Sequence, residues 1–254
     1  MNLKGKKIAI TGGTGCIGGL LVEFVAQKGA TPVIISRSPA PNSKWQYIHG
    51  DLSNIDDVTA IGKQLAKIQP DILVNLAGIQ YFGSLDEQPS SQIEMLYQIN
   101  LIAPVLLTQA VLPSMKKRGS GQIVNIGSIF GSIPFAHFVT YSSAKAGLKA
   151  FSEALRRELT DTGINVTYIA PRAVKTPINN EKVMQLAKQT KMAMDDPERI
   201  VARIAKAIEN DAKDVYIGFP ESIFVRVNAL LPRVVDGALA KNDRIAAKIL
   251  TPQS

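Results

Sequence analysis

Short apolar segments alternate with longer amphipathic stretches along most of the chain. The apolar segments are rich in Val and Ile, as in Lys7–Thr11 (KIAIT), Ile72–Asn75 (ILVN) and Gln122–Ile126 (QIVNI). Continuous apolar strands separated by helices are typical of a parallel sheet that is covered on both faces. The sequence therefore predicts an α/β fold, a doubly wound, Rossmann-type parallel sheet of seven strands with helices on both faces.

The expected elements leave no room for a domain linker. We expect strands over 7–11, 32–36, 46–49, 72–75, 122–126, 165–169 and 215–218, and helices that include 17–28, 55–68, 91–117 and 139–160. Residues 1–220 are predicted to form one domain, in which the Met- and Lys-rich segment 177–196 caps the carboxyl ends of the strands. Residues 221–254 are predicted to add an amphipathic helical tail to the same domain.

Composition excludes several classes of protein. The chain is 46% apolar, which excludes a disordered chain, and its single Cys excludes an intrachain disulfide. The net charge is +8, but Lys and Arg are scattered, so we expect an anionic cofactor or substrate and no nucleic acid. No uninterrupted apolar run reaches the roughly 18 residues of a membrane span, so we expect a cytoplasmic protein.

A glycine-rich turn follows the first expected strand. Its sequence, TGGTGCIG over residues 11–18, leads directly into the first expected helix. Glycines allow a tight turn and a close approach of the backbone to a ligand, and the N–H groups and dipole at a helix N-terminus attract phosphate. The turn predicts a dinucleotide site that contains Gly12, Thr14, Gly15, Cys16, Ile17 and Gly18.

The end of the second expected strand indicates which dinucleotide is bound. An acidic residue there would bind a ribose 2′-hydroxyl and indicate NAD(H). The chain has Ser36 and Arg37 instead, and a guanidinium pairs with a 2′-phosphate that an acid would repel. NADP(H) is therefore the expected cofactor, with NAD(H) the alternative.

A Tyr-Lys pair and a preceding serine suggest proton transfer. Tyr141 and Lys145 are four residues apart in an expected helix and so share one face, and Ser128 follows the fifth expected strand. A phenol with a pKa near 10 transfers protons poorly at neutral pH, and a neighbouring ammonium group is expected to lower that pKa.

Together these residues resemble the short-chain dehydrogenase/reductase family over residues 5–220. Further matches follow in the family's order. Asp51 and Leu52 stand after the third strand, where the family has an adenine contact, and Asn75, Ala77 and Gly78 match its NxAG turn after the fourth strand. Asn100 matches the family's proton-relay Asn on the next helix, and Pro171 and Thr176 match its Pro and Thr beside the nicotinamide.

The resemblance implies a role for each residue of the predicted site. Tyr141 would exchange a proton with the substrate oxygen, Ser128 would hydrogen-bond that oxygen, and Lys145 would lower the tyrosine pKa and hold the nicotinamide ribose. Asn100 would connect Lys145 to solvent through a water molecule. The family's two long helices also imply a homodimer or homotetramer.

Three features depart from the family pattern. Cys16 occupies the position of the usual middle glycine, so the spacing of Gly12, Gly15 and Gly18 fits a variant of the turn that is common among epimerases. Arg172 replaces the glycine that usually follows Pro171. The usual C-terminal Gly-Gly is absent. We expect Cys16 to be an inert small residue. The two histidines are too few for a His-rich metal site, and no metal is expected.

The tail carries an apolar stripe at helical spacing, which Pro232 should kink, together with Arg and Lys residues. Packing on its own domain or on a second copy, a lid over the substrate and an interfacial membrane helix all stay open.

The resulting functional hypothesis is an NADPH-dependent carbonyl reductase or, in reverse, an alcohol dehydrogenase. The Met-rich cap and apolar tail suggest a hydrophobic ketone or hydroxy compound, with a 3-oxoacyl thioester or lipid-like ketone as the first substrate class. A sugar-nucleotide epimerase or dehydratase and a non-catalytic NADP-binding sensor or scaffold are the alternatives.

Overall fold

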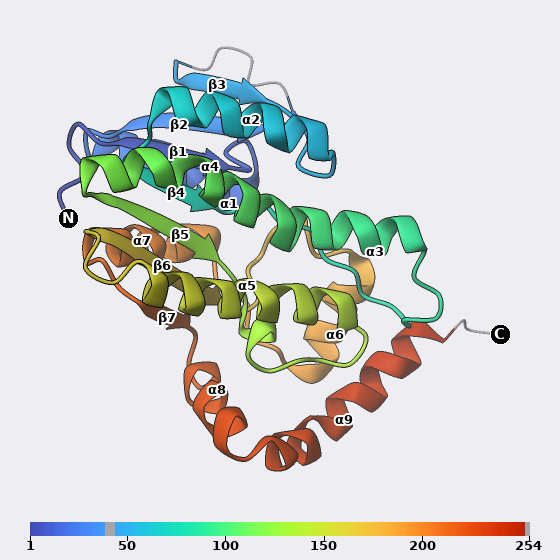
Figure 1. Ribbon diagram of the computed structural model, residues 1–254. Coiled ribbons are helices and arrows are strands. Elements are labelled where there is room, and N and C mark those ends of the chain that lie inside the picture. The colour runs from blue at the N-terminus through green and yellow to red at the C-terminus, as the bar shows by residue number, and fades with distance from the viewer. Residues whose placement is uncertain (39–43, 252–254) are drawn as a thin grey trace.

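A single parallel sheet organises the molecule. The computed structural model describes residues 1–38 and 44–251. Its seven strands pair in parallel in the order β3-β2-β1-β4-β5-β6-β7 (Figure 1). The strand order reverses between β1 and β4, which is the arrangement of a doubly wound Rossmann-type sheet. The predicted fold class is therefore confirmed.

The observed elements lie within a few residues of the predicted ones. The strands are β1 Lys7–Thr11, β2 Thr31–Ser36, β3 Gln46–His49, β4 Ile72–Asn75, β5 Gly121–Ile126, β6 Ile164–Pro171 and β7 Asp214–Ile217. The helices are α1 Cys16–Gln27, α2 Ile55–Ile68, α3 Ser90–Tyr97, α4 Ala103–Arg118, α5 Val139–Glu158, α6 Glu181–Thr190, α7 Pro197–Glu209, α8 Glu221–Leu230 and α9 Pro232–Leu250. A π-helical turn, Gln98–Ile102, joins α3 to α4, and a short 3₁₀ turn, Ile129–Gly131, follows β5.

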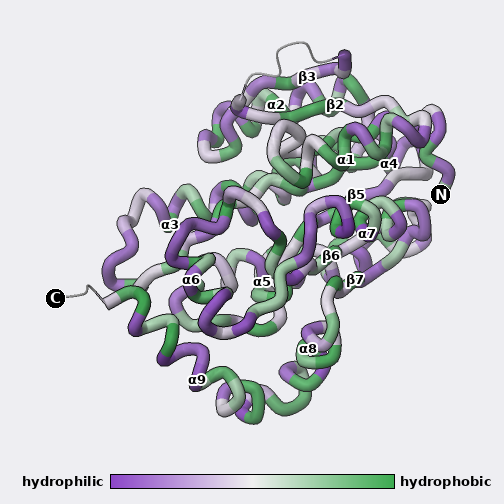
Figure 2. Tube along the Cα trace, turned by 180° about the vertical axis from the view of Figure 1, so that it is seen from behind, coloured by the Kyte–Doolittle hydropathy of each residue, from purple (hydrophilic) through white to green (hydrophobic). Residues whose placement is uncertain are grey.

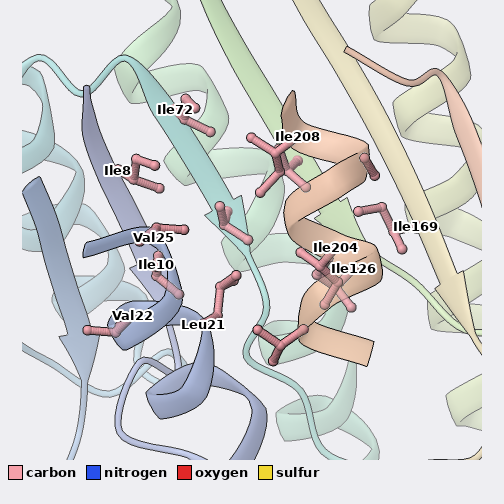
Figure 3. Packing of buried hydrophobic residues seen from close by; sticks show 14 of the residues in the cluster. Ile8, Ile10, Leu21, Val22, Val25, Ile72, Ile126, Ile169, Ile204 and Ile208 are labelled. Atoms are coloured by element: carbon pink, nitrogen blue, oxygen red, sulfur yellow. The ribbon is translucent and has the colours of Figure 1, made fainter. Parts of the chain in front are cut away.

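Each face of the sheet is covered by its own helices. Ile8 and Ile10 of β1 belong to the cluster that includes α1 and α7, whereas Ala9 between them belongs to the cluster with α2 and α4. Figure 3 shows Ile204 and Ile208 of α7 in the first of these clusters. Successive strand residues point to opposite faces, so a strand buried on both sides must be apolar throughout.

The helical stretch 90–118 is long and apolar enough to cross a membrane by length and composition, which the sequence analysis did not expect. In the fold, however, its apolar side covers the sheet. Leu107, Val111 and Met115 are fully buried in the cluster that contains α2 and β5. Core packing therefore accounts for the buried side of this stretch, whereas Met95 and Ile102 remain exposed.

The C-terminal tail is a bent arm of two helices (Figure 1). The bend falls at Leu231, and Pro232 begins α9, as the predicted kink requires. Val225 and Val235 pack against Ile129 and Ile133, and Ala246 near the far end of α9 joins a cluster with α6. The arm thus packs on its own domain on both sides of the bend and again near the C-terminal end of α9.

Candidate active site

The turn after β1 brings two stretches of backbone unusually close together. Gly12 has a φ of +70°, which favours glycine, and its amide donates to the Ile35 carbonyl at 2.8 Å. A Cβ on Gly18 would collide with the Gly12 carbonyl, so α1 can approach the turn only without that atom. These two glycines position the start of α1 directly at the carboxyl edge of the sheet.

The N-terminus of α1 is suited to an anion. Its N-cap is Gly15, no side chain caps it, and no acidic residue lies in the first turn. In contrast, Asn54 caps α2 by accepting hydrogen bonds from the amides of Asp56 and Asp57. The uncapped N–H groups and the helix dipole of α1 would stabilise a phosphate.

A cavity of about 560 Å³ lies at this edge of the sheet. Most of the predicted cofactor-binding residues line it: Gly12, Thr14, Gly15, Cys16, Ile17, Gly18, Ser36, Arg37, Asp51, Leu52, Ala77, Gly78 and Thr176. The sequence analysis missed several small or apolar lining residues, namely Ile35, Ser38, Gly50, Leu76, Ile79, Ile99, Pro177 and Ile178. The size is within the usual range for cofactor sites, and the glycine cradle and uncapped helix fit a dinucleotide.

Polar groups are held in place at the rim of this cavity. The hydroxyls of Thr14 and Ser36 are 2.6 Å apart, which links the first turn to the end of β2. The Asp51 carboxylate accepts hydrogen bonds of 2.9 Å from both the amide and the hydroxyl of Ser53. The backbone bond from Ser53 is the main cause of a lowered pKa of Asp51, and the charge of Arg37 lowers it further. Asp51 is therefore an anion at neutral pH.

A second cavity, of about 140 Å³, adjoins the first and brings the predicted proton-transfer residues together. Ser128, Tyr141 and Lys145 line it, as do Pro171 and Thr176. The two cavities share Ile17, Leu76, Gly78, Thr176 and Ile178. The rest of its lining includes residues that the sequence analysis did not assign to the site, namely Gln80, Phe130, Phe138, Asn179, Val183, Leu186 and Met192.

Lys145 carries a buried amine at the second cavity. Its exposed fraction is 4%, and its Nζ donates to the Ile126 carbonyl at 3.0 Å. Burial lowers the pKa of Lys145 from its usual 10.5 to about 8. The Nζ atom lies 5.9 Å from the centre of the Tyr141 ring, one helical turn away. Lys145 is thus charged at neutral pH, close to the phenol.

The pKa of Tyr141 differs from the sequence-based prediction. Burial raises the pKa of Tyr141, and the hydrogen bond with Ser128 opposes this effect only in part. The net lowering expected from the sequence is therefore wrong for this structure, because loss of solvation outweighs the contacts that favour the phenolate. Tyr141 holds its proton at neutral pH.

Asn100 lies in the π-helical turn, beside Lys145. Its amide group donates to the Ile79 carbonyl at 2.7 Å, and its Oδ1 accepts from the Ile79 amide at 3.2 Å. A Cβ on Gly78 would lie 2.7 Å from that Oδ1 and 3.4 Å from the Lys145 Nζ. The absence of a Cβ on Gly78 therefore lets Asn100 and Lys145 approach the backbone of this turn. Turns of this kind occur often at functional sites.

Asn75 is not brought to either cavity. It is 2% exposed, and its amide donates to Asn125 at 2.8 Å and to Thr108 at 3.4 Å. The predicted contact of Asn75 with the cofactor is therefore corrected: its side chain links β4 to β5 and α4 beneath the cavity floor. The sequence could not separate this role from ligand binding, because both place an amide at the end of β4.

Arg172 joins three segments around the second cavity. Its guanidinium donates to both carboxylate oxygens of Asp195, at 2.9 and 3.0 Å, and to Glu221 at 3.2 Å. Asp195 lies at the end of the cap and Glu221 begins α8, while Arg172 follows β6. The residue that departs from the family's glycine therefore connects the sheet, the cap and the C-terminal arm.

Comparison with known proteins assigns the family. The model of the short chain dehydrogenase family matches residues 6–187. The chain belongs to the short chain dehydrogenase family. It is an oxidoreductase that acts on CH–OH or C=O groups.

Two relatives and one solved structure show the range of the similarity. The ketoacyl reductase HetN of Nostoc is 32% identical over 85% of this chain and 79% of its own length. D-xylose 1-dehydrogenase of Caulobacter vibrioides is 34% identical over 69% of this chain and 74% of its own length. A Sphingobium yanoikuyae short-chain dehydrogenase, solved in complex with NADPH, superposes with a TM-score of 0.78 at 25% identity, covering 92% of this chain and 95% of that one.

Replacing Arg172 in this short chain dehydrogenase should destabilise it. Arg172→Met leaves the carboxylate of Asp195, which is 4% exposed, with the exposed Arg199 as its one ionic partner among residues 1–38 and 44–251. We expect a loss of about 2–4 kcal/mol in the free energy of unfolding, measured by urea denaturation. The control Lys175→Met removes an exposed ion pair with Asp196 and should cost less than about 1 kcal/mol. Equal effects of both variants would contradict this assignment.

The buried Lys145 predicts a pH-dependent stability. The unfolded chain keeps the Lys145 proton up to about pH 10.5, whereas the folded protein releases it near 8, so the wild type should gain stability between these values. Lys145→Met removes this cost and should be about 2 kcal/mol more stable at pH 7, without the rise at higher pH. Urea denaturation at pH 7 and pH 10 measures both effects, with Lys149→Met as the control. A Lys145→Met protein that is less stable at pH 7 would refute the assignment.

Proposed function

We propose that the protein is an NADPH-dependent carbonyl reductase, or an alcohol dehydrogenase in reverse, for a hydrophobic ketone or hydroxy compound. One observation carries the proposal: Ser128, Tyr141 and Lys145 line a small, mostly apolar cavity that adjoins the glycine-lined cofactor cavity. A carbonyl group in the small cavity would lie beside a proton donor and next to the end of a bound dinucleotide.

Arg37 supports NADPH as the cofactor. It lines the larger cavity at the end of β2, where the described strand ends without an acidic residue that would repel a 2′-phosphate. Asp51 follows β3 and lines the same cavity, near enough for the charge of Arg37 to lower its pKa. The similarity to the Sphingobium enzyme, whose structure contains NADPH, is consistent with this choice.

The bound cofactor would supply the hydride, and the protein would handle the substrate oxygen and its proton. Tyr141 holds its proton at neutral pH and would donate it to the carbonyl oxygen. Ser128 would donate a hydrogen bond to the same oxygen as negative charge develops there. Lys145, charged below about pH 8, would stabilise the tyrosinate that remains.

Asn100 would hold in place the backbone at Gly78 and Ile79, beside which the tyrosinate would regain its proton through Lys145. Its two hydrogen bonds to Ile79 fix the backbone next to Gly78. Because Gly78 has no Cβ, the Asn100 amide and the Lys145 amine both lie close to its backbone, and a water molecule bound beside them would exchange protons with Lys145.

The cavity lining supports a hydrophobic substrate. Phe130, Phe138, Val183 and Leu186 line the second cavity, and Met192 adds a flexible apolar side chain. The polar residues Gln80 and Asn179 are held by a hydrogen bond of 3.1 Å between them. This lining fits an acyl chain better than a sugar, so we favour a 3-oxoacyl thioester or lipid-like ketone. The similarity to HetN agrees with that choice.

The glycine spacing alone also suits an epimerase or dehydratase. The C-terminal arm favours the reductase, because α9 packs back on α6 and forms no separate substrate domain within residues 221–251. The intact set of Ser128, Tyr141 and Lys145 favours an enzyme over a sensor.

The first experiment measures NADPH consumption with a chain-length series of 3-oxoacyl thioesters and simple ketones. We expect turnover that rises with chain length and falls at least about 100-fold in Tyr141→Phe, because the substrate oxygen loses its proton donor. Tyr97→Phe, which removes an exposed hydroxyl bonded to Ser143, is the control and should retain activity. Undiminished turnover by Tyr141→Phe would refute the proposed mechanism.

The cofactor preference is tested at Arg37. Arg37→Asp should lower kcat/KM with NADPH by about 10- to 100-fold, through loss of charged hydrogen bonds and added repulsion, and leave the value with NADH nearly unchanged. Arg157→Asp, an exposed change on α5, should alter neither value. An Arg37→Asp enzyme that still prefers NADPH to the wild-type extent would show that another group recognises the cofactor.

A further inference from the structure

The elbow between α8 and α9 exposes an unusual run of apolar residues. All of residues 229–234 are exposed, and five of these six, Ala-Leu-Leu-Pro-Arg-Val, are apolar. Leu230 is 80% exposed, Leu231 58% and Val234 60%. Phe219, Ile223 and Phe224 add exposed apolar side chains at and just before the start of α8. We define the elbow patch as the six exposed apolar side chains of Phe219, Ile223, Phe224, Leu230, Leu231 and Val234. A large contiguous apolar patch usually marks an interaction site.

The elbow patch is not needed to hold the arm on the domain. The inner side of the arm is already buried through Val225 and Val235, which pack against Ile129 and Ile133. The far end of α9 is held by a separate cluster with α6. The exposed residues therefore form a second apolar side that the fold itself does not use.

The shape of the arm indicates what kind of partner fits. Figure 1 shows the elbow as the bend between α8 and α9, on the side of the arm away from the sheet, and Figure 2 shows strongly hydrophobic segments there. A projecting apolar bend can enter a soft apolar medium directly, whereas a protein partner would need a groove of matching shape. A lipid interface is such a medium.

The charges beside the elbow patch favour an anionic surface. Arg226 and Arg233 are both exposed and flank the two leucines in sequence. Lys241, Arg244 and Lys248 continue the positive charge along α9, and the chain as a whole carries +8. Of the three acids in this arm, Glu221 is paired with Arg172 and Asp243 is half-buried, which leaves Asp236 exposed.

We propose that the α8–α9 elbow docks the protein on an anionic lipid bilayer. Leu230 and Leu231 would enter the interface, and Arg226 and Arg233 would contact lipid phosphates. Because α9 packs on α6 and Glu221 pairs with Arg172, docking of the elbow would also fix the cap and the second cavity relative to the lipid surface. This inference does not depend on the proposed reaction, since lipid binding can be measured without turnover.

The test is co-sedimentation of the full chain with vesicles of phosphatidylcholine alone or with 30% phosphatidylglycerol. We expect at least about tenfold stronger binding to the anionic vesicles, decreasing as salt increases. The double variant Leu230→Ser/Leu231→Ser should lower this binding at least about tenfold, because two buried side chains are lost. Arg226→Glu/Arg233→Glu should remove the preference for anionic vesicles.

Matched controls separate the elbow patch from general surface effects. Ile55→Ser/Leu85→Ser changes two side chains that are each 50% exposed elsewhere, and Lys63→Glu/Lys67→Glu makes the same charge change on α2. Both controls should bind vesicles like the wild type. Circular dichroism and thermal unfolding check that every variant is folded.

Several outcomes would overturn the proposal. Failure of the folded wild type to bind anionic vesicles would do so, as would unchanged binding by the leucine variant. Light scattering after gel filtration gives the oligomeric state of each variant. If the leucine variant changed its mass but not its vesicle binding, the elbow patch would be an interface between copies of this chain.

Discussion

Parallel pairing of all seven strands is the constraint on which the site depends. It brings every carboxyl end to the same edge of the sheet, so turns that are far apart in sequence become neighbours. The glycine turn after β1, Gly78 after β4 and Ser128 after β5 meet there because these strands are adjacent. Both cavities follow from this arrangement, since each is lined mainly by residues at strand ends and by the helices that begin beside them.

The proposed chemistry at this edge of the sheet requires a charged amine in a buried position, where loss of solvation disfavours charge. Lys145 is almost fully buried, and its amine is held by one carbonyl, that of Ile126. The same burial keeps Tyr141 protonated and brings the pKa of Lys145 close to neutrality. Such a site holds on Tyr141 a proton that can be donated, with the charged Lys145 beside it, and the cost in stability is offset by the large apolar clusters on both faces of the sheet.

The sequence predicted those features that local patterns specify. The predicted bounds of β1, β3, β4 and α2 agree with the structure, because the alternation of short strands with amphipathic stretches marks them in the sequence. Features that depend on burial or on distant partners could not be predicted. The π-helical turn at Asn100, the structural role of Asn75, the ion pairs of Arg172 and the raised pKa of Tyr141 all arise from tertiary contacts. The exposure of the elbow patch also depends on tertiary contacts. The apolar stripe in the tail sequence does not show which of its residues the domain buries.

A crystal structure of the protein grown with NADPH is the most direct test of the site. We expect the diphosphate over the N-terminus of α1, the 2′-phosphate beside Ser36 and Arg37, and the nicotinamide at the second cavity next to Tyr141 and Lys145. A nucleotide bound elsewhere, or a nicotinamide ring directed away from Tyr141, would contradict the proposed reductase site.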